Sequence, residues 1–293
     1  MKYQITHSTK YDYADAVSLS HNIARLRPRD DGTRQICLRH ELSVLPAPSD
    51  RSDSLDYFGN HVSYFSLQES HNHLTITGRS DVEVTAMARP DFALGSSWEE
   101  VRDKILASAD PETRAAREFT FDSRYVIRSA ELAQYALGSF EASQPFLECV
   151  LDLTHRIYHE FEFLPGATKV GTPIADVLRM RKGVCQDFTH LQLGCLRSLG
   201  FSARYVSGYI VTTPPPGRPR LQGADVSHAW VGVFAPGLGW IDFDPTNGLI
   251  PSDAHITVGW ARDYDDIGPV RGVVVGGRRQ HLDVSVDVAP LES

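Results

Sequence analysis

The sequence predicts an α+β protein in which an N-terminal antiparallel β-sandwich precedes a part that mixes helices and strands. Three observations support this prediction. Polarity alternates from residue to residue in several segments of the first ninety residues, which is the period of a half-buried strand. Apolar residues then recur at helical spacing between residues 98 and 200. Three short strand-like segments follow between residues 202 and 244.

The chain is expected to divide near residue 92 into two units. Glycine, proline and aspartate separate the predicted strands of the first unit, residues 1–92, and these strands cover residues 38–45, 61–67, 73–77 and 81–86. The segment PDFALGSS, residues 90–97, has the composition of a boundary. We expect the second unit to cover residues 93–293, with a core at about 144–250 and a C-terminal β extension that contains HLDVSVDV.

Three helices are predicted in the first part of the second unit. Ser97 is placed to cap the first, residues 98–109. The second, residues 144–161, has Pro145 in its first turn and an apolar stripe along one face. The third, residues 172–183, starts at a Thr-Pro pair and ends in a basic turn that we expect a glycine to close.

A fourth helix carries a cysteine at its start. In GVCQDFTHLQLGCLRSLG, residues 183–200, apolar residues repeat at helical spacing and Gly200 fits a C-terminal cap. Cys185 therefore lies in or just before the first turn. The strand-like segments SARYVSGYIV, DVSHAWVGVF and WIDFD follow. The Pro- and Gly-rich segment of residues 212–223 separates the first two strands, and we expect it to be mobile.

Composition excludes several classes of protein. The chain has 293 residues, of which 42% are hydrophobic and 23% charged, as in ordinary globular proteins rather than disordered chains. A formal net charge of -8 argues against a nucleic-acid partner. The first residues lack the apolar stretch of a signal peptide, and no segment approaches the roughly 18 apolar residues of a spanning helix. We therefore expect a cytoplasmic protein with no membrane partner.

Among the four cysteines, Cys185 has the sequence context of a nucleophile. No C-x-x-C pair is present, so neither a zinc nor a disulfide framework is indicated. A helix N-terminus favours thiolate over thiol, and its free N–H groups can bind an oxyanion. A thiolate also needs a partner base, which His228 can supply from the middle of a strand. Asp244 ends the next strand and would lie beside His228, so the three residues fit the nucleophile, base and orienting acid of an acyl transfer through a thioester.

The sequence around these residues resembles bacterial transglutaminase-like cysteine enzymes of the transglutaminase superfamily. The blocks that carry the resemblance are GVCQDFTHLQLGCLRSLGFSARYVSGY, SHAWVGVF and GWIDFDPTNG, with further blocks near both ends such as FGNHVSYFSL and HITVGWARDYDDIGPVRGV. The resemblance covers nearly the whole chain. It implies a papain-like core, a helix bundle packed on an antiparallel sheet, after an N-terminal β domain. It also implies that Cys185, His228 and Asp244 are the catalytic residues.

Other candidate residues have structural explanations. Cys37, Cys149 and Cys195 suit buried packing, and Asp187 suits stabilisation of its helix, because a carboxylate beside Cys185 would disfavour the thiolate. His71 with His73, and His155 with His159, could each offer two metal ligands, but no third ligand accompanies either pair. We therefore expect no metal and no cofactor.

Three aromatic residues are candidates for the substrate cleft. Trp230 lies two residues after His228 on the same strand face, and Trp240 and Tyr209 are on neighbouring strands. Core packing is the alternative for all three.

Several functions remain open at this point. The expected substrate is a peptide, a protein or a small amide. A peptidase or amidase and an amide-forming transferase would share the same three residues and differ only in the acceptor, water or an amine. A catalytically silent binding module and a metallohydrolase are the other classes. The oligomeric state cannot be read from the sequence.

Overall fold

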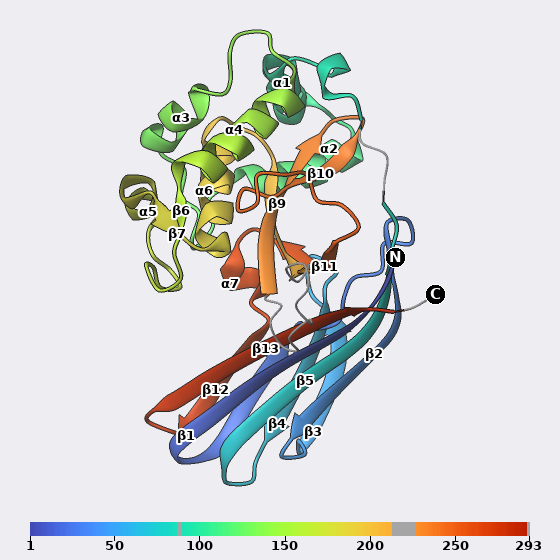
Figure 1. Ribbon diagram of the computed structural model, residues 1–293, viewed down its shortest axis with the longest axis vertical. Helices are drawn as coiled ribbons and strands as arrows, with labels where there is room; N and C mark the ends of the chain where they lie inside the picture. The colour runs from blue at the N-terminus through green and yellow to red at the C-terminus, as the bar shows by residue number, and fades with distance from the viewer. Residues whose placement is uncertain (87–89, 213–226, 292–293) are drawn as a thin grey trace, which may run out of the picture.

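The computed structural model describes residues 1–86, 90–212 and 227–291, which form two lobes (Figure 1). One lobe is a large antiparallel sheet, and the other combines the helices with a four-stranded sheet. The fold class is therefore α+β, with a β-rich N-terminal region, as predicted. The segment expected to be mobile, residues 212–223, lies outside the described residues except for Thr212. No helix in the described parts of the chain is long and apolar enough to cross a membrane.

Strand β1 (Lys2–Ala24) organises the large sheet. Its first half pairs with β5 (His71–Val84) on one side and β13 (Gln280–Pro290) on the other. Its second half pairs with β4 (His61–Leu67) and β12 (Val270–Gly276). β2 (Gln35–Leu45) and β3 (Asp50–Leu55) complete one hydrogen-bonded sheet of seven strands. Two strands from the C-terminus are thus part of the N-terminal lobe.

This arrangement differs from the expected organisation in two respects. The C-terminal extension, assigned to the second unit, pairs with β1 because strand alternation reveals a buried face but not which sheet the strand joins. The strands predicted at 73–77 and 81–86 form the single strand β5. Gly78, Arg79 and Ser80 between them stay extended and pair with β1, although glycine more often marks a break.

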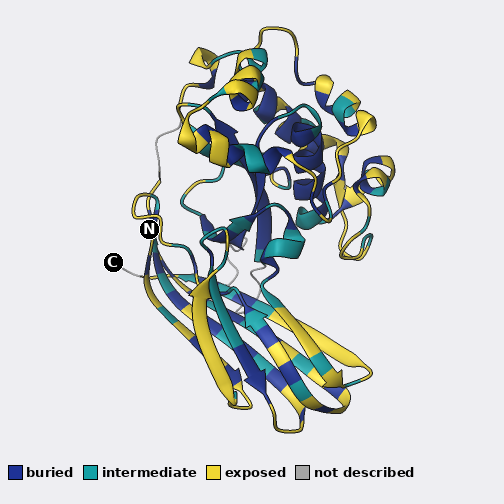
Figure 2. Cartoon of the chain, turned by 180° about the vertical axis from the view of Figure 1, so that it is seen from behind, coloured by how far each residue is buried: buried dark blue, intermediate teal, exposed yellow. Residues whose placement is uncertain are grey.

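The helical lobe contains α1 (Trp98–Ala107), α2 (Pro111–Ala116), α3 (Ala130–Leu137), α4 (Phe146–Glu160), α5 (Ile174–Met180), α6 (Cys185–Ser198) and α7 (Tyr264–Ile267), with 3-10 turns at Phe92–Leu94 and Arg117–Thr120. Among the described residues, α1, α4, α5 and α6 are the four predicted helices, and α2, α3 and α7 were not predicted. The Ser97 side chain accepts a hydrogen bond from the backbone N–H of Glu100, which confirms the predicted cap. Helix α6 is buried along most of its length, and α3, α4 and α5 surround it (Figure 2).

The second sheet lies against α6 and has the order β10-β9-β8-β11. Its strands are β8 (Ala203–Ile210), β9 (Ser227–Ala235), β10 (Gly239–Phe243) and β11 (His255–Ala261), and all neighbours are antiparallel. A short parallel pair, β6 (Glu162–Phe163) with β7 (Lys182–Gly183), precedes α6. Strands β8 and β9 are buried on both faces, which makes them the rigid centre of this lobe.

Buried amides join β11 to the N-terminal lobe. The side chain of Gln35 donates to the carbonyl of Thr257 and accepts from its N–H, both at 2.8 Å. Asn60 makes the same pair of hydrogen bonds with Trp260, at 2.9 and 3.0 Å. Each amide replaces a missing neighbouring strand, so the edge of the small sheet is hydrogen-bonded to the other lobe.

We predict that the C-terminal strand stabilises both lobes through Val286. This residue is 1% exposed in an apolar cluster formed by β1, β5, β8 and β11. Val286→Ala should lower the free energy of unfolding by about 2 kcal/mol, because two buried methyl groups are lost. Val284→Ala, at a site 47% exposed on the same strand, should change it by less than about 0.5 kcal/mol. Equal effects in chemical denaturation would show that β13 does not belong to this core.

Candidate active site

Cys185 occupies the first position of α6, immediately after the turn that ends α5. Arg181, with φ 55°, adopts the left-handed conformation that closes α5, so the predicted glycine closure is wrong. Cys185 is partly exposed, whereas the helix behind it is buried. The N–H groups at the start of a helix have no partners one turn earlier, although that of Asp187 donates to the carbonyl of Val184 here.

Asp187 stabilises the start of this helix. Its Oδ2 accepts hydrogen bonds from the backbone N–H of Val184 at 2.9 Å and from the Thr168 hydroxyl at 2.6 Å. Gly183 makes room for this contact, since a Cβ there would lie 2.8 Å from the Cβ of Asp187. Burial raises the pKa of Asp187, and the two hydrogen bonds oppose that shift. The glycine before Cys185 therefore serves the cap that holds the cysteine in place.

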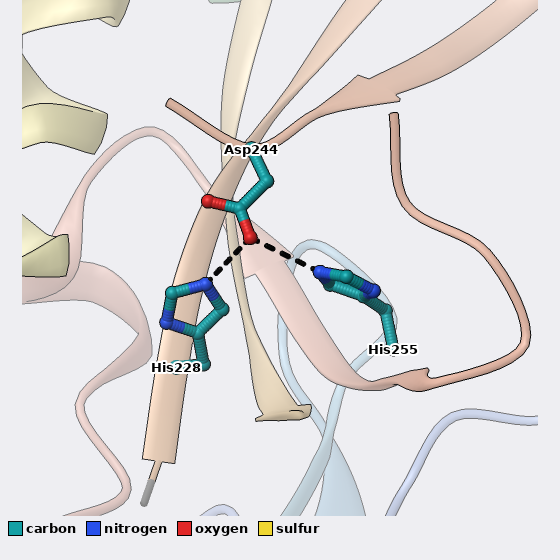
Figure 3. A group of neighbouring side chains, drawn as sticks. All are labelled: His228, Asp244 and His255. Carbon is teal, nitrogen blue, oxygen red and sulfur yellow. Dashed lines mark hydrogen bonds and ion pairs between the residues drawn. The ribbon is translucent and has the colours of Figure 1, made fainter. Parts of the chain in front are cut away.

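His228, near the start of β9, and Asp244, directly after the end of β10, point toward one another (Figure 3). His228, on β9, lies 2.8 Å from Asp244 through Nε2 and Oδ2, and both side chains are buried. Asp244 follows directly after β10, the neighbour of β9, so the antiparallel pairing places the two residues side by side. The predicted proximity of His228 and Asp244 is confirmed.

The histidine also lies close enough to Cys185 for the cysteine to contribute to its pKa. Because Nε2 faces Asp244, the other ring nitrogen, Nδ1, is the one available to the sulfur. Burial lowers the pKa of His228, but the hydrogen bond to Asp244, the nearby Cys185 and the charges of both residues outweigh burial and raise it to about 10. An ordinary histidine has a pKa near 6.5. At neutral pH the ring is therefore protonated.

The turn after β10 supplies further hydrogen-bond donors to both oxygens of the Asp244 carboxylate. Its Oδ1 accepts from the backbone N–H groups of Thr246 and Asn247 at 2.9 and 3.2 Å. The Asn247 side chain donates to Oδ2 at 2.7 Å. Burial raises the pKa of Asp244, but the hydrogen bonds from His228, His255 and Asn247 hold it well below its usual range. Asp244 is therefore an anion despite being fully buried.

The three aromatic candidates do not line a cleft at Cys185. Trp230 is fully buried and donates from Nε1 to Asp242 at 3.0 Å. Tyr209 is 2% exposed and lies 3.0 Å from His7 in the N-terminal lobe. Trp240 is half-buried and lines a cavity of about 410 Å³ with Arg34 and Asp242 rather than with Cys185. The alternative of core packing holds for Trp230 and Tyr209, because β8 and β9 are buried on both faces.

The other cysteines and histidine pairs lie elsewhere. Cys37, Cys149 and Cys195 are buried, and burial raises the pKa of each thiol, to about 12 for Cys149. His71 is buried and His73 lies against Asp12 at the surface of the large sheet. None of these residues reaches the candidate site.

The structure adds residues that the sequence did not single out. His255, the first residue of β11, places Nε2 3.1 Å from Oδ2 of Asp244. Tyr205 and Tyr264 lie near Cys185: burial raises the pKa of both phenols, and the charge of the cysteine contributes. His255 could not be predicted from the sequence, because its strand joins the sheet beside β8 rather than beside β10, and sequence spacing does not reveal this strand order.

His228, Asp244 and His255 also have the composition of a metal site. Their three ligand atoms lie within 4.8 Å of one another. Each of these atoms is already used in a hydrogen bond to another member of the group. A metal would require both imidazoles to present a lone pair at Nε2 instead of a proton, and Asn247 also donates to the same carboxylate oxygen. The donor set therefore fits a hydrogen-bonded network better than a metal centre.

Comparison with known proteins agrees with this architecture. Residues 3–83 match the model of the bacterial transglutaminase-like N-terminal region, and residues 133–245 match that of the transglutaminase-like superfamily. The uncharacterized protein Rv2569c of Mycobacterium tuberculosis (strain ATCC 25618 / H37Rv) is 40% identical over 299 residues, covering 99% of this chain and 93% of that protein.

Two further similarities are more distant. A protein-glutamine gamma-glutamyltransferase of Pseudomonas aeruginosa is 27% identical over 163 residues, covering 52% of this chain and 24% of that protein. The crystal structure of a "Putative Cysteine Protease" from Cytophaga hutchinsonii superposes with a TM-score of 0.76 at 22% identity, covering 100% of this chain and 91% of that one. The chain therefore belongs to the transglutaminase-like superfamily and carries the N-terminal region of its bacterial members.

Proposed function

We propose that the protein is a cysteine-dependent acyl-transfer enzyme that cleaves peptide or amide bonds through a thioester at Cys185. One observation carries the proposal. Cys185 begins a helix and lies beside His228, whose Nε2 is 2.8 Å from a buried carboxylate. This is the arrangement of nucleophile, base and orienting acid that acyl transfer requires. Membership of the transglutaminase-like superfamily supports it.

In the first half of the reaction, the Cys185 sulfur attacks the carbonyl carbon of the substrate. The negative charge on the carbonyl oxygen would be stabilised by N–H groups at the start of α6. His228 holds the proton that the leaving amine needs, since its raised pKa keeps the ring protonated. The C–N bond breaks, the amine leaves with that proton, and the acyl group remains on sulfur.

In the second half, neutral His228 removes a proton from the acceptor. The acceptor attacks the thioester, the C–S bond breaks, and the proton returns to the histidine–cysteine pair. Water gives a carboxylic acid, and a primary amine gives a new amide. We infer that water is the ordinary acceptor. Bulk water is about 55 M, so an amine would need a site that binds it and excludes water.

The alternative acceptor, an amine, is favoured by one comparison, the partial similarity to a protein-glutamine gamma-glutamyltransferase. The aromatic residues predicted to line the substrate cleft do not provide an amine site. Trp230 and Tyr209 are in the core, and Trp240 lines a cavity whose lining does not include Cys185 or His228. We therefore retain the peptidase or amidase as the proposal and the transamidase as the alternative.

We predict that iodoacetamide alkylates Cys185 first at pH 6, where an ordinary thiol with a pKa near 8.5 is almost fully protonated. His228→Ala should slow this reaction by about tenfold or more, because the protonated partner of the thiolate is lost. Peptide mapping by mass spectrometry gives the rate at each cysteine. Cys149 and Cys195 are internal controls, since both are fully buried. Equal labelling of all four cysteines would contradict the proposal.

We predict that the His228 ring titrates near pH 10 rather than near 6.5. Asp244→Asn should lower this pKa, because the negative charge and the acceptor for Nε2–H are both lost. The sign follows from the contacts, which stabilise the protonated ring. Imidazole ¹⁵N chemical shifts recorded from pH 5 to 11 measure it. A ring that titrates near 6.5 in the unmodified protein would be inconsistent with the network.

We predict that the acyl-enzyme hydrolyses faster than it transfers its acyl group to amines. The enzyme is acylated with p-nitrophenyl acetate and then divided between buffer and buffer with a millimolar primary amine. Acetate should dominate in both, since water competes at about 55 M. Cys185→Ala is the control for acylation at other sites. Dominance of the amide product would instead establish the transamidase.

A further inference from the structure

A second histidine contacts the carboxylate of Asp244. His255 Nε2 lies 3.1 Å from Oδ2, the same oxygen that His228 approaches at 2.8 Å (Figure 3). The two rings come from different strands, β11 and β9. We propose that His255 is a positioning residue that fixes the Asp244 carboxylate for His228. The inference rests on the proposed function of the Cys185–His228 pair.

The direction of the hydrogen bond follows from the chemistry of the two groups. Asp244 is held as an anion and can only accept, so Nε2 of His255 must carry a proton and donate. The other ring nitrogen, Nδ1, is buried and has no hydrogen-bond partner among the described residues. A proton on Nδ1 would therefore be a buried donor without an acceptor. His255 is best satisfied as a neutral ring with its proton on Nε2.

A donor at this position has two effects on Asp244. First, His228 and His255 approach one oxygen while two backbone N–H groups of the turn hold the other, so the carboxylate plane is fixed. Second, the hydrogen bond from His255 stabilises the ionised carboxylate, which keeps the shared proton on His228 instead of Asp244. Both effects keep the His228 ring aimed at Cys185.

The position of His255 is itself fixed by its neighbours. The indole of Trp230 lies edge-on to the imidazole, with ring centroids 5.2 Å apart. Gly208 lets this indole approach β8, because a Cβ there would lie 2.5 Å from it. Two residues along β11, Thr257 is held by Gln35 of the N-terminal lobe. The carboxylate is thus connected through one strand to the neighbouring lobe.

Two amide variants separate the hydrogen bond from packing. His255→Gln places an amide nitrogen near the position of Nε2, so it can still donate to Asp244. His255→Asn is polar too but one methylene shorter, so its nitrogen falls short. We expect iodoacetamide to alkylate Cys185 at pH 6 about tenfold more slowly in the Asn variant than in the unmodified protein. The Gln variant should stay close to the unmodified rate.

A second readout reports on His228 directly. In the unmodified protein and the Gln variant, its Nε2–H should give a sharp downfield proton resonance, because the proton lies in a short buried hydrogen bond. The resonance should broaden in the Asn variant. A histidine that only fills space would leave it unchanged. If His255→Asn does not fold, His255→Leu repeats the test with an apolar side chain against Trp230.

His71 provides a matched control. It too is buried, with one ring nitrogen hydrogen-bonded and the other without a partner among the described residues, but it lies in the large sheet. His71→Asn should leave both the alkylation rate and the His228 resonance unchanged. A loss of rate in this control equal to that in His255→Asn would overturn the inference, since it would reflect general destabilisation.

Other results have separate meanings. The role of His255 alone would be overturned if Cys185 were alkylated at the unmodified rate in both His255→Asn and His255→Leu. It would also be overturned if the Gln and Asn variants lost alkylation rate equally while the His228 resonance stayed unchanged. Stoichiometric zinc in the purified protein that is lost in His255→Asn would overturn it in favour of a metal site. If alkylation of Cys185 does not depend on His228, the proposed function itself fails.

Discussion

A buried carboxylate governs the geometry of this site. Asp244 has no access to water, and removing a charged group from water without partners is strongly unfavourable. The protein compensates with N–H donors that converge on both oxygens, from the turn after β10 and from two histidines. Strands β9, β10 and β11 must therefore keep a fixed relation to one another. These donors also align His228. Because they occupy the other acceptor positions of the carboxylate, the His228 ring can donate to it from only one direction.

The cysteine is held by a separate set of contacts. Asp187 caps the helix start and accepts a hydrogen bond from Thr168, and Gly183 leaves room for the Asp187 side chain. Helix α6 then runs through the core, where burial along most of its length prevents it from shifting. Cys185 and His228 thus belong to two rigid elements, a buried helix and a buried strand, that contact one another directly. The proposed function requires rigid placement of this kind, since the stability of an ion pair depends on a short distance between its two charges.

Much of this site could be predicted from the sequence because its parts are local. The helix start at Cys185 and the adjacency of β9 and β10 follow from spacing and from a short turn. His255 could not be found in the same way, since β11 joins the sheet beside β8 and strand order is not encoded in alternation. For the same reason, the C-terminal strands were placed in the wrong lobe. Trp230 and Tyr209 were ambiguous because strands buried on both faces show no alternation that distinguishes core from cleft.

The central claim is that Cys185 forms a covalent acyl intermediate with the help of His228. Its most direct test is mass spectrometry of the intact protein quenched in acid during incubation with peptide and activated-ester libraries, followed by peptide mapping. The account predicts an added acyl mass on the peptide that contains Cys185, absent from Cys185→Ala and strongly reduced in His228→Ala. Turnover that persists in Cys185→Ala, or an acyl group mapped to another residue, would contradict it.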